Sequence, residues 1–180
     1  MNKFTVKSGR LQVSDPCYGL GDGVEIKAKK GEWIAYVEME DCNSWGTRVK
    51  NLVAEYKGEM KGAGLYEGNG RICVDSGQAG IFDRAFYKDD SVVSGLSVGD
   101  RAICQEEPWY SICCDRTLND SQWGVIPFGC VSSSGYGDGC YEVTYISDKN
   151  NEAVRVEINF IPDEDSDEEY SDEEDSEEEN

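Results

Sequence analysis

Four aspartates occupy positions where the chain is expected to turn, and their carboxylates are the side chains best suited to chemistry. Asp15 precedes a proline, and Asp138 stands between two glycines. Asp75 and Asp83 enclose a glycine-containing segment between them. If the fold brings these loops together, the carboxylates and nearby backbone carbonyls can hold a hard cation such as Ca²⁺ or Mg²⁺, or can form an acid/base pair. The four aspartates are therefore candidate ligand or metal residues.

A structural role for the same aspartates remains open. Aspartate before proline, or within Asp-Ser-Gly and Gly-Asp-Gly, commonly forms a tight turn by accepting hydrogen bonds from nearby backbone N–H groups. Asp83 can cap a short helix that begins at Arg84. The calcium alternative receives no support from spacing, because the sequence contains no EF-hand loop.

Histidine is absent from the chain, and this absence excludes more chemistry than any motif supports. A Ser-His-Asp triad, a Cys-His pair and every histidine-bearing metal site are ruled out. The sequence also lacks a P-loop, and its glycine clusters are typical of turns rather than phosphate-binding loops. No His-dependent catalysis is possible, and the sequence favours a protein that is not an enzyme and needs no cofactor.

The eight cysteines do not form the C-x-x-C pairs that a structural zinc site requires. The adjacent Cys113 and Cys114 would point to opposite faces of an expected strand. Neither a signal peptide nor a membrane-spanning apolar run is present, so we expect a soluble, intracellular, cytoplasmic protein without membrane contact. In that setting the cysteines are predicted to be mostly reduced thiols.

Three tryptophans stand beside turn signals, where their rings could line a binding face. Trp45 and Trp123 each precede a glycine, and Trp109 follows a proline. Such rings often dominate the binding energy of a protein interface. The alternative is that they fill the core of a β domain. Trp45, Trp109 and Trp123 are therefore candidate partner-surface residues.

Alternation of apolar and polar residues predicts an all-β fold. The clearest pattern covers 141–145 and, after a polar turn, 154–160, which is typical of a β-hairpin with one buried face. Rougher strands are predicted at 11–13, 24–28, 33–39, 48–56, 71–74, 101–105, 109–113 and 125–130. About ten strands with at most one or two short helices indicate an antiparallel β-sandwich or barrel-like sheet.

Residues 163–180 differ sharply from the rest, because they contain thirteen carboxylates and no basic residue. Their like charges repel, and they have almost no apolar surface to offset the roughly 1–2 kcal/mol per residue that backbone ordering costs. The sequence therefore predicts a single β-rich domain over 1–162 and a disordered acidic tail over 163–180. The domain is only mildly negative and lacks a basic stripe, so no direct nucleic-acid binding is expected.

Three serines in the acidic tail are each followed by three acids, a context that acidophilic kinases recognise. Phosphorylation would add further negative charge. The alternative is that small polar residues simply space the carboxylates. The candidate phosphorylation sites are Ser166, Ser171 and Ser176.

Three segments carry a family resemblance. The first covers 8–17 and ends in Asp-Pro, the second covers 74–83 and begins with Val-Asp, and the third contains Gly-Asp-Gly at 137–139 before the closing hairpin. In this order and spacing, about residues 8–161 resemble the bacterial and viral family known only as domain of unknown function 4241. The resemblance implies a β-rich single domain and brings no activity with it.

Taken together, these features predict a non-enzymatic protein-interaction module, such as a phage or viral accessory factor, whose acidic tail contacts a basic partner. The alternative is a domain that binds a small ligand or a divalent metal, or a metal-dependent enzyme, and that uses the aspartate cluster with Ca²⁺ or Mg²⁺. Binding that depends on the tail favours the first, and stabilisation by a cation favours the second.

Overall fold

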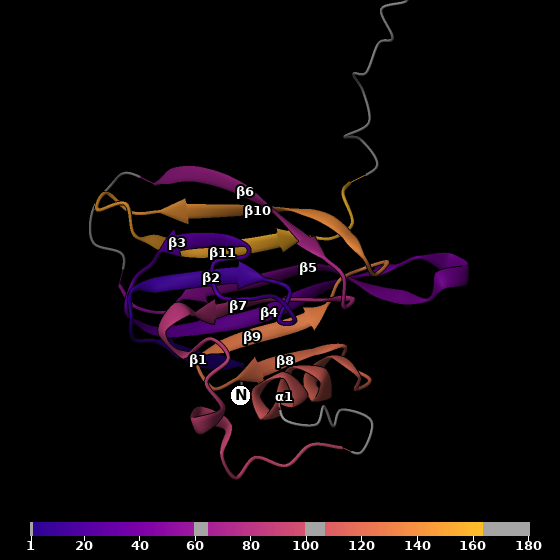
Figure 1. The fold of residues 1–180 in the computed structure, drawn as a ribbon. Helices are drawn as coiled ribbons and strands as arrows, with labels where there is room; N and C mark the ends of the chain where they lie inside the picture. The colour runs from indigo at the N-terminus through magenta and orange to yellow at the C-terminus, as the bar shows by residue number, and fades with distance from the viewer. Residues whose placement is uncertain (1, 60–64, 100–106, 164–180) are drawn as a thin grey trace, which may run out of the picture.

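The computed structural model describes residues 2–59, 65–99 and 107–163, and the strands of these ranges form two antiparallel sheets (Figure 1). The six-stranded sheet has the order β1-β4-β5-β11-β10-β6, and the five-stranded sheet has the order β3-β2-β7-β9-β8. The predicted all-β class and antiparallel sandwich are therefore confirmed. The strands are β1 (Lys3–Val6), β2 (Arg10–Ser14), β3 (Val24–Lys27), β4 (Gly31–Asp41), β5 (Thr47–Tyr56), β6 (Tyr66–Val74), β7 (Gln78–Asp83), β8 (Trp123–Ile126), β9 (Gly129–Ser133), β10 (Gly139–Ser147) and β11 (Ala153–Asn159).

The main hydrophobic core lies between the inner faces of the two sheets. Successive side chains of a strand point to opposite faces of its sheet, so every second residue faces the core. Strands β10 and β11 form the predicted hairpin, in which Val143 lies opposite Ile158. Burial of these apolar faces is the principal force that holds the sheets together. The largest fully buried side chains of this core are Trp33, Leu11, Leu52, Ile81 and Ile158.

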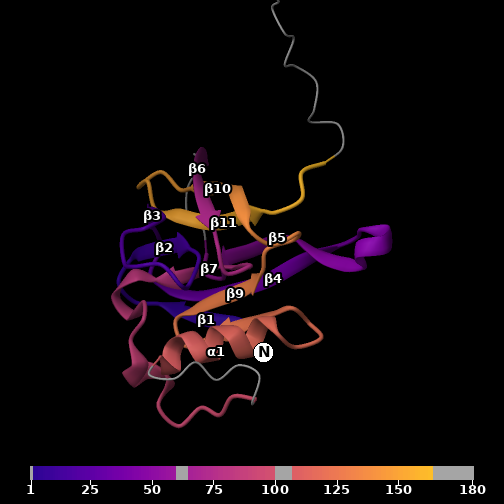
Figure 2. The same ribbon diagram turned by 45° about the vertical axis from the view of Figure 1, so that its right-hand side comes forward.

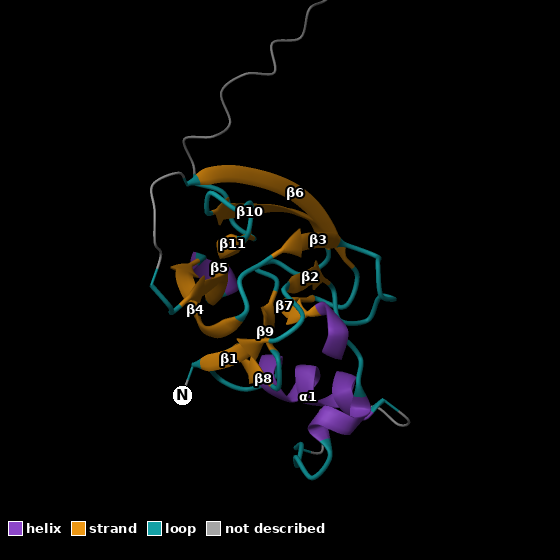
Figure 3. Cartoon of the chain, turned by 90° about the vertical axis from the view of Figure 1, so that its left-hand side faces the viewer, coloured by secondary structure: helices purple, strands orange, loops and turns teal. Residues whose placement is uncertain are grey.

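A second, smaller core lies on the other face of the five-stranded sheet, under α1 (Pro108–Thr117). Figure 3 shows α1 beside β8, and Figure 2 shows it lying along that side of the molecule. Trp109, Ile112 and Cys113 face the sheet, at the spacing of one helix face, and are at most 2% exposed. The predicted strand over 109–113 is therefore wrong, since Pro108 begins a helix there.

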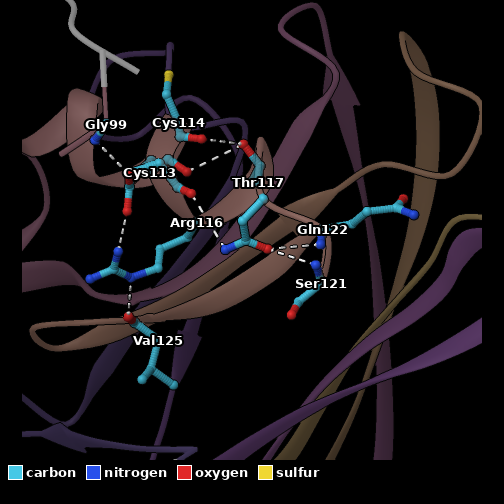
Figure 4. Close-up of polar contacts among 10 residues, drawn as sticks. Gly99, Cys113, Cys114, Arg116, Thr117, Ser121, Gln122 and Val125 are labelled. Carbon is cyan, nitrogen blue, oxygen red and sulfur yellow. Dashed lines mark hydrogen bonds and ion pairs between the residues drawn. The ribbon is translucent and has the colours of Figure 1, made fainter. Parts of the chain in front are cut away.

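The C-terminal end of α1 is tied to β8 by polar contacts (Figure 4). Arg116 Nε donates to the carbonyl of Val125 at 3.2 Å. A Cβ at Gly124 would stand 2.6 Å from Arg116 Cδ, so only glycine lets the arginine lie this close to the strand.

Neither α1 nor the short 3-10 turns of the described ranges are long and apolar enough to cross a membrane. The 3-10 turns are η1 (Asn43–Trp45), η2 (Arg84–Phe86) and η3 (Asp90–Val93).

The observed strands differ from the predicted ones at several further places. The predicted single strand over 125–130 is two strands, because Pro127 and Phe128 form a tight turn between β8 and β9, with Phe128 at a φ of 64°. Strands β1 and β7 were not predicted. The strand predicted at 101–105 and most of the acidic tail, residues 164–180, lie outside the described residues.

The cysteines are divided between one disulfide and several thiols. Cys73 and Cys140 form a disulfide between β6 and β10, which the sequence did not predict. Cys17, Cys42, Cys113 and Cys130 are free thiols. Of these, Cys17 is exposed, and Cys42, Cys113 and Cys130 are buried.

Candidate functional site

Four turns meet at one end of the molecule, and we call this region the loop end. It comprises residues 15–18 after β2, 42–46 between β4 and β5, 75–77 between β6 and β7, and 134–138 between β9 and β10. Ser134 N donates to the carbonyl of Gly77 at 3.0 Å, and the rings of Trp45 and Tyr136 lie 5.9 Å apart. In Figure 1 the β4–β5 hairpin projects from this end beyond the rest of the domain.

Asp15 joins two of these turns through a fully buried carboxylate. Its Oδ2 accepts hydrogen bonds from the backbone N–H groups of Asp75 at 2.9 Å and Ser76 at 2.8 Å. Its Oδ1 accepts from the Ser76 hydroxyl at 2.6 Å and from the N–H of Cys17 at 2.8 Å. Both carboxylate oxygens are thus engaged by the chain itself, which is the arrangement expected of a structural carboxylate.

The electrostatics of this turn follow from those bonds. Burial acts to raise the pKa of Asp15, but the Ser76 hydroxyl and the three backbone donors outweigh it and hold the pKa below its usual value. Although the residue as a whole is exposed, partial desolvation of the Cys17 thiol, together with a hydrogen bond to the Asp15 carboxylate, raises its pKa to about 12. Cys17 is therefore a protonated thiol at neutral pH and a poor nucleophile.

The buried side chain of Tyr87 stabilises the turn after β2 through its hydroxyl group. The Tyr87 hydroxyl lies 3.1 Å from the carbonyl oxygen of Asp15 and 3.0 Å from that of Tyr18. It also accepts a hydrogen bond from the Ser14 hydroxyl at 3.1 Å. Burial raises the pKa of Tyr87 well above its usual value, so the phenol stays protonated and keeps its proton for these carbonyls. The turn after β2 is consequently fixed by both side chain and backbone.

Asp75 and Asp138 are exposed at the loop end. Val74 and Gly139 form the last pair of the β6–β10 ladder, and Asp75 directly follows β6 while Asp138 directly precedes β10. A hydrogen bond from Tyr18 to the Asp75 carboxylate raises the pKa of Tyr18 to about 12. The fold therefore brings three of the four predicted aspartates, Asp15 among them, to one end of the molecule.

Asp83 is separate from the other three. It pairs with Leu11 at the start of β2, whereas Asp15 follows the end of that strand. Its carboxylate accepts hydrogen bonds from the N–H groups of Lys7, Ser8 and Ala85, and it caps η2 as the sequence predicted. Among the described residues, no group of three or more His, Cys, Asp or Glu side chains is placed to hold a metal ion.

The exposed aromatic residues of the loop end are Trp45 and Tyr136. Trp45 is 62% exposed and Tyr136 is 55% exposed, and their rings pack edge to face. We call them the aromatic pair. Trp109 is only 2% exposed, so the partner-surface interpretation does not hold for it. Trp123 is half-buried and packs against the main core.

A hollow of about 650 Å³ lies beside Tyr136 and contains the last described residues of the chain. Lys50 Nζ lies 2.7 Å from Asp163 Oδ1 and 3.3 Å from Glu40 Oε2. The carbonyl of Lys50 also accepts from the N–H groups of Phe160 at 2.8 Å and Ile161 at 3.3 Å. A hydrogen bond with the Cys42 side chain raises the pKa of Tyr136, which links that ring to the hollow. The hollow is lined by Glu40, Asp41, Cys42, Asn43, Lys50, Tyr136, Ile161, Pro162 and Asp163.

Sequence reasoning missed Tyr136 and Lys50. A tyrosine between two glycines signals an exposed ring in a turn, and this could have pointed to Tyr136. Nothing local could have pointed to Lys50, because its partner Asp163 is 113 residues away. Ser166, Ser171 and Ser176 lie outside the described residues.

No protein-family model, no curated protein and no solved structure matches this chain. The resemblance to domain of unknown function 4241 therefore stays a prediction from sequence motifs, and the site is interpreted from its own geometry.

Proposed function

We propose that the protein is a non-enzymatic interaction module that binds a basic protein partner at the loop end. The observation that carries this proposal is the position of Asp163, which Lys50 holds in the hollow beside Tyr136. The acid-rich sequence from Asp163 onwards therefore begins next to the exposed aromatic pair. The described carboxylates of Glu40, Asp41 and Asp163 line the same hollow as the Tyr136 ring.

The chemistry of this surface suits lysine and arginine side chains. Exposed Trp and Tyr rings attract cations placed over their faces and supply large contact areas. Carboxylates of the loop end and of the hollow beside Tyr136 also favour fast association with a basic partner. The described acidic residues of this surface are Glu40, Asp41, Asp75, Asp138 and Asp163.

Metal or acid/base chemistry at the aspartates is less well supported. The carboxylate oxygens of Asp15 and Asp83 accept hydrogen bonds from the chain, so a cation would have to displace those donors. Asp83 also lies away from the loop end.

The test is binding of a fluorescently labelled, arginine- and lysine-rich peptide, followed by anisotropy. Removal of residues 164–180 is expected to weaken binding at least about ten-fold at low salt. Replacement of both Trp45 and Tyr136 by Ala is expected to weaken it about five- to thirty-fold, the range of moderate hot-spot residues. Tyr66→Ala is the matched control, because Tyr66 is 60% exposed on β6 but lies at the far end of the β6–β10 ladder. Equal affinity for all four proteins contradicts the proposal.

A further inference from the structure

The Cys73–Cys140 disulfide lies next to the loop end and is open to solvent. Cys73 on β6 and Cys140 on β10 face each other across the two strands, and both are exposed. One pair further along the ladder stand Val74 and Gly139, and the turns 75–77 and 134–138 begin directly beyond them. The disulfide therefore joins the two strands that lead into two turns of the loop end.

Strand β6 depends on this bond more than an interior strand would. It is the edge of its sheet, and among the described strands β10 is its one hydrogen-bonded neighbour. Its interior contains Gly68 and Gly70, which have no side chains to pack against neighbouring strands. A covalent link near its end thus supplies support that a second neighbouring strand would give elsewhere.

The turns at the end of these strands carry the site. The N–H groups of Asp75 and Ser76 bind the Asp15 carboxylate, and Ser134 N binds the Gly77 carbonyl. Tyr136 lies in the second of these turns. If β6 and β10 separate at the disulfide, these three hydrogen bonds from backbone N–H groups lose their alignment. The turn that carries Tyr136 is then no longer held in one position.

The free thiols of the described residues are poorly suited to attack this disulfide. Burial raises the pKa of Cys130 to about 12 and that of Cys113 well above its usual value, and Cys17 also has a raised pKa of about 12. Cys42 is buried. Since only a thiolate attacks a disulfide, an external thiol is a better attacking group than any of these four. A hollow of about 760 Å³, lined in part by Arg71, Cys140 and Glu142, gives such a thiol access.

We propose that Cys73–Cys140 is a thiol–disulfide exchange site whose reduction by an external dithiol loosens the loop end. A thiolate of the dithiol attacks one sulfur, the Cys73–Cys140 bond breaks, and a mixed disulfide forms. The second thiolate of the dithiol then attacks its own sulfur in that mixed disulfide and releases the protein. Overall, two electrons and two protons pass from the dithiol to Cys73 and Cys140, which become thiols, and the dithiol becomes a disulfide. The effect on partner binding rests on the function proposed above, whereas the loosening of the turns does not.

The test treats the full-length native protein with dithiothreitol at graded ratios of its reduced and oxidised forms. Reduction is expected to add two titratable thiols and to speed hydrogen exchange at the amides of Asp75, Ser76 and Ser134 at least about ten-fold. The variant with both Cys73→Ser and Cys140→Ser should match the reduced protein and ignore dithiothreitol. Cys113→Ala, which removes a buried thiol of the second core away from the loop end, should keep the full response.

Two results would overturn this proposal. One is a disulfide that stays intact in the native protein under strongly reducing ratios, and the other is reduction without faster exchange at those three amides. The basic peptide is then titrated against both forms, and weaker binding to the reduced form is expected. Because amide exchange is measured without peptide, it shows whether reduction loosens the loop end even if the peptide binds neither form.

Discussion

Lys50 holds Asp163 by an ion pair of 2.7 Å across 113 residues of sequence. The same lysine receives backbone hydrogen bonds from Phe160 and Ile161, so one residue of β5 fixes the segment that follows β11. Two carboxylates, Glu40 and Asp163, share its ammonium group, and they raise the pKa of Lys50. The acidic sequence therefore starts from a defined point beside Tyr136.

Neutralising Lys50 should strengthen the interaction with a basic peptide. In Lys50→Gln the backbone hydrogen bonds remain, while Glu40 and Asp163 lose the cation that now occupies them. We expect the peptide to bind about two- to five-fold more tightly at low salt, the gain expected from one exposed ion pair. Lys57→Gln is the control, since Lys57 pairs with Glu32 away from the loop end. Anisotropy titration measures both, and weaker binding by Lys50→Gln would contradict the proposed role of the hollow.

Replacement of Asp15 should destabilise the domain without altering its fold. In Asp15→Asn the amide nitrogen faces an N–H donor, and the hydrogen bonds to a charged group are lost. We expect a loss of about 2–4 kcal/mol in the free energy of unfolding, measured in urea. Asp138→Asn is the matched control because Asp138 is exposed, and its change should stay within about 0.5 kcal/mol. A loss for Asp15→Asn no larger than that of the control would show that the carboxylate does not hold the turns.

The contribution of Asp15 should also depend on pH. Its folded-state pKa is lowered, so its stabilisation is complete above the unfolded-state pKa of about 3.9 and is lost as the pH falls through the folded-state value. The difference in unfolding free energy between the native chain and Asp15→Asn should therefore be constant near neutrality and shrink below about pH 4. The other carboxylates are present in both proteins, so the difference isolates Asp15. A difference that grows on acidification would be the contrary result.

Asp83 should matter for a separate reason. Its carboxylate binds two N–H groups between β1 and β2 and caps η2, so Asp83→Ala leaves buried donors without partners. We expect a loss of about 2–3 kcal/mol, whereas Asp89→Ala, which removes the more exposed cap of η3, should cost about 1 kcal/mol or less. Urea unfolding compares the two. Equal losses would mean that the β1–β2 contacts of Asp83 add nothing.

The tryptophans offer a direct test of which rings belong to the surface. Trp109→Ala empties a buried site in the second core and should cost about 3–5 kcal/mol. Trp45→Ala removes a ring that is 62% exposed and should change the unfolding free energy by less than about 1 kcal/mol. Thermal or urea unfolding measures both changes. A large loss for Trp45→Ala would assign that ring to stability rather than to binding.

The parts of the fold that could be predicted are those encoded locally. Period-two alternation around Val143 and Val156 predicted the β10–β11 hairpin, and the position of Asp83 before Arg84 predicted the cap of η2. The stretch at Trp109 was misjudged because its residue types favour strands, although Pro108 and the burial spacing of Trp109, Ile112 and Cys113 fit a helix.

The candidate site could be predicted only in part, because its contacts join distant segments. Asp15 and Ser76 are 61 residues apart, and their hydrogen bond leaves no local pattern. The same holds for Cys73 and Cys140, which the pairing of β6 with β10 brings together. Sequence motifs marked the turns correctly, and only the three-dimensional structure shows that they meet.

The salt dependence of peptide binding tests the central claim most directly. The dissociation constant of the basic peptide is measured between about 50 and 300 mM salt, a range over which screening changes strongly. We expect removal of residues 164–180 to flatten the dependence of log Kd on log salt, because fewer charges are engaged. Replacing Trp45 and Tyr136 by Ala should weaken binding at every salt concentration and leave the slope unchanged. An unchanged slope after truncation, or unchanged affinity without the aromatic pair, would contradict a binding surface built from both.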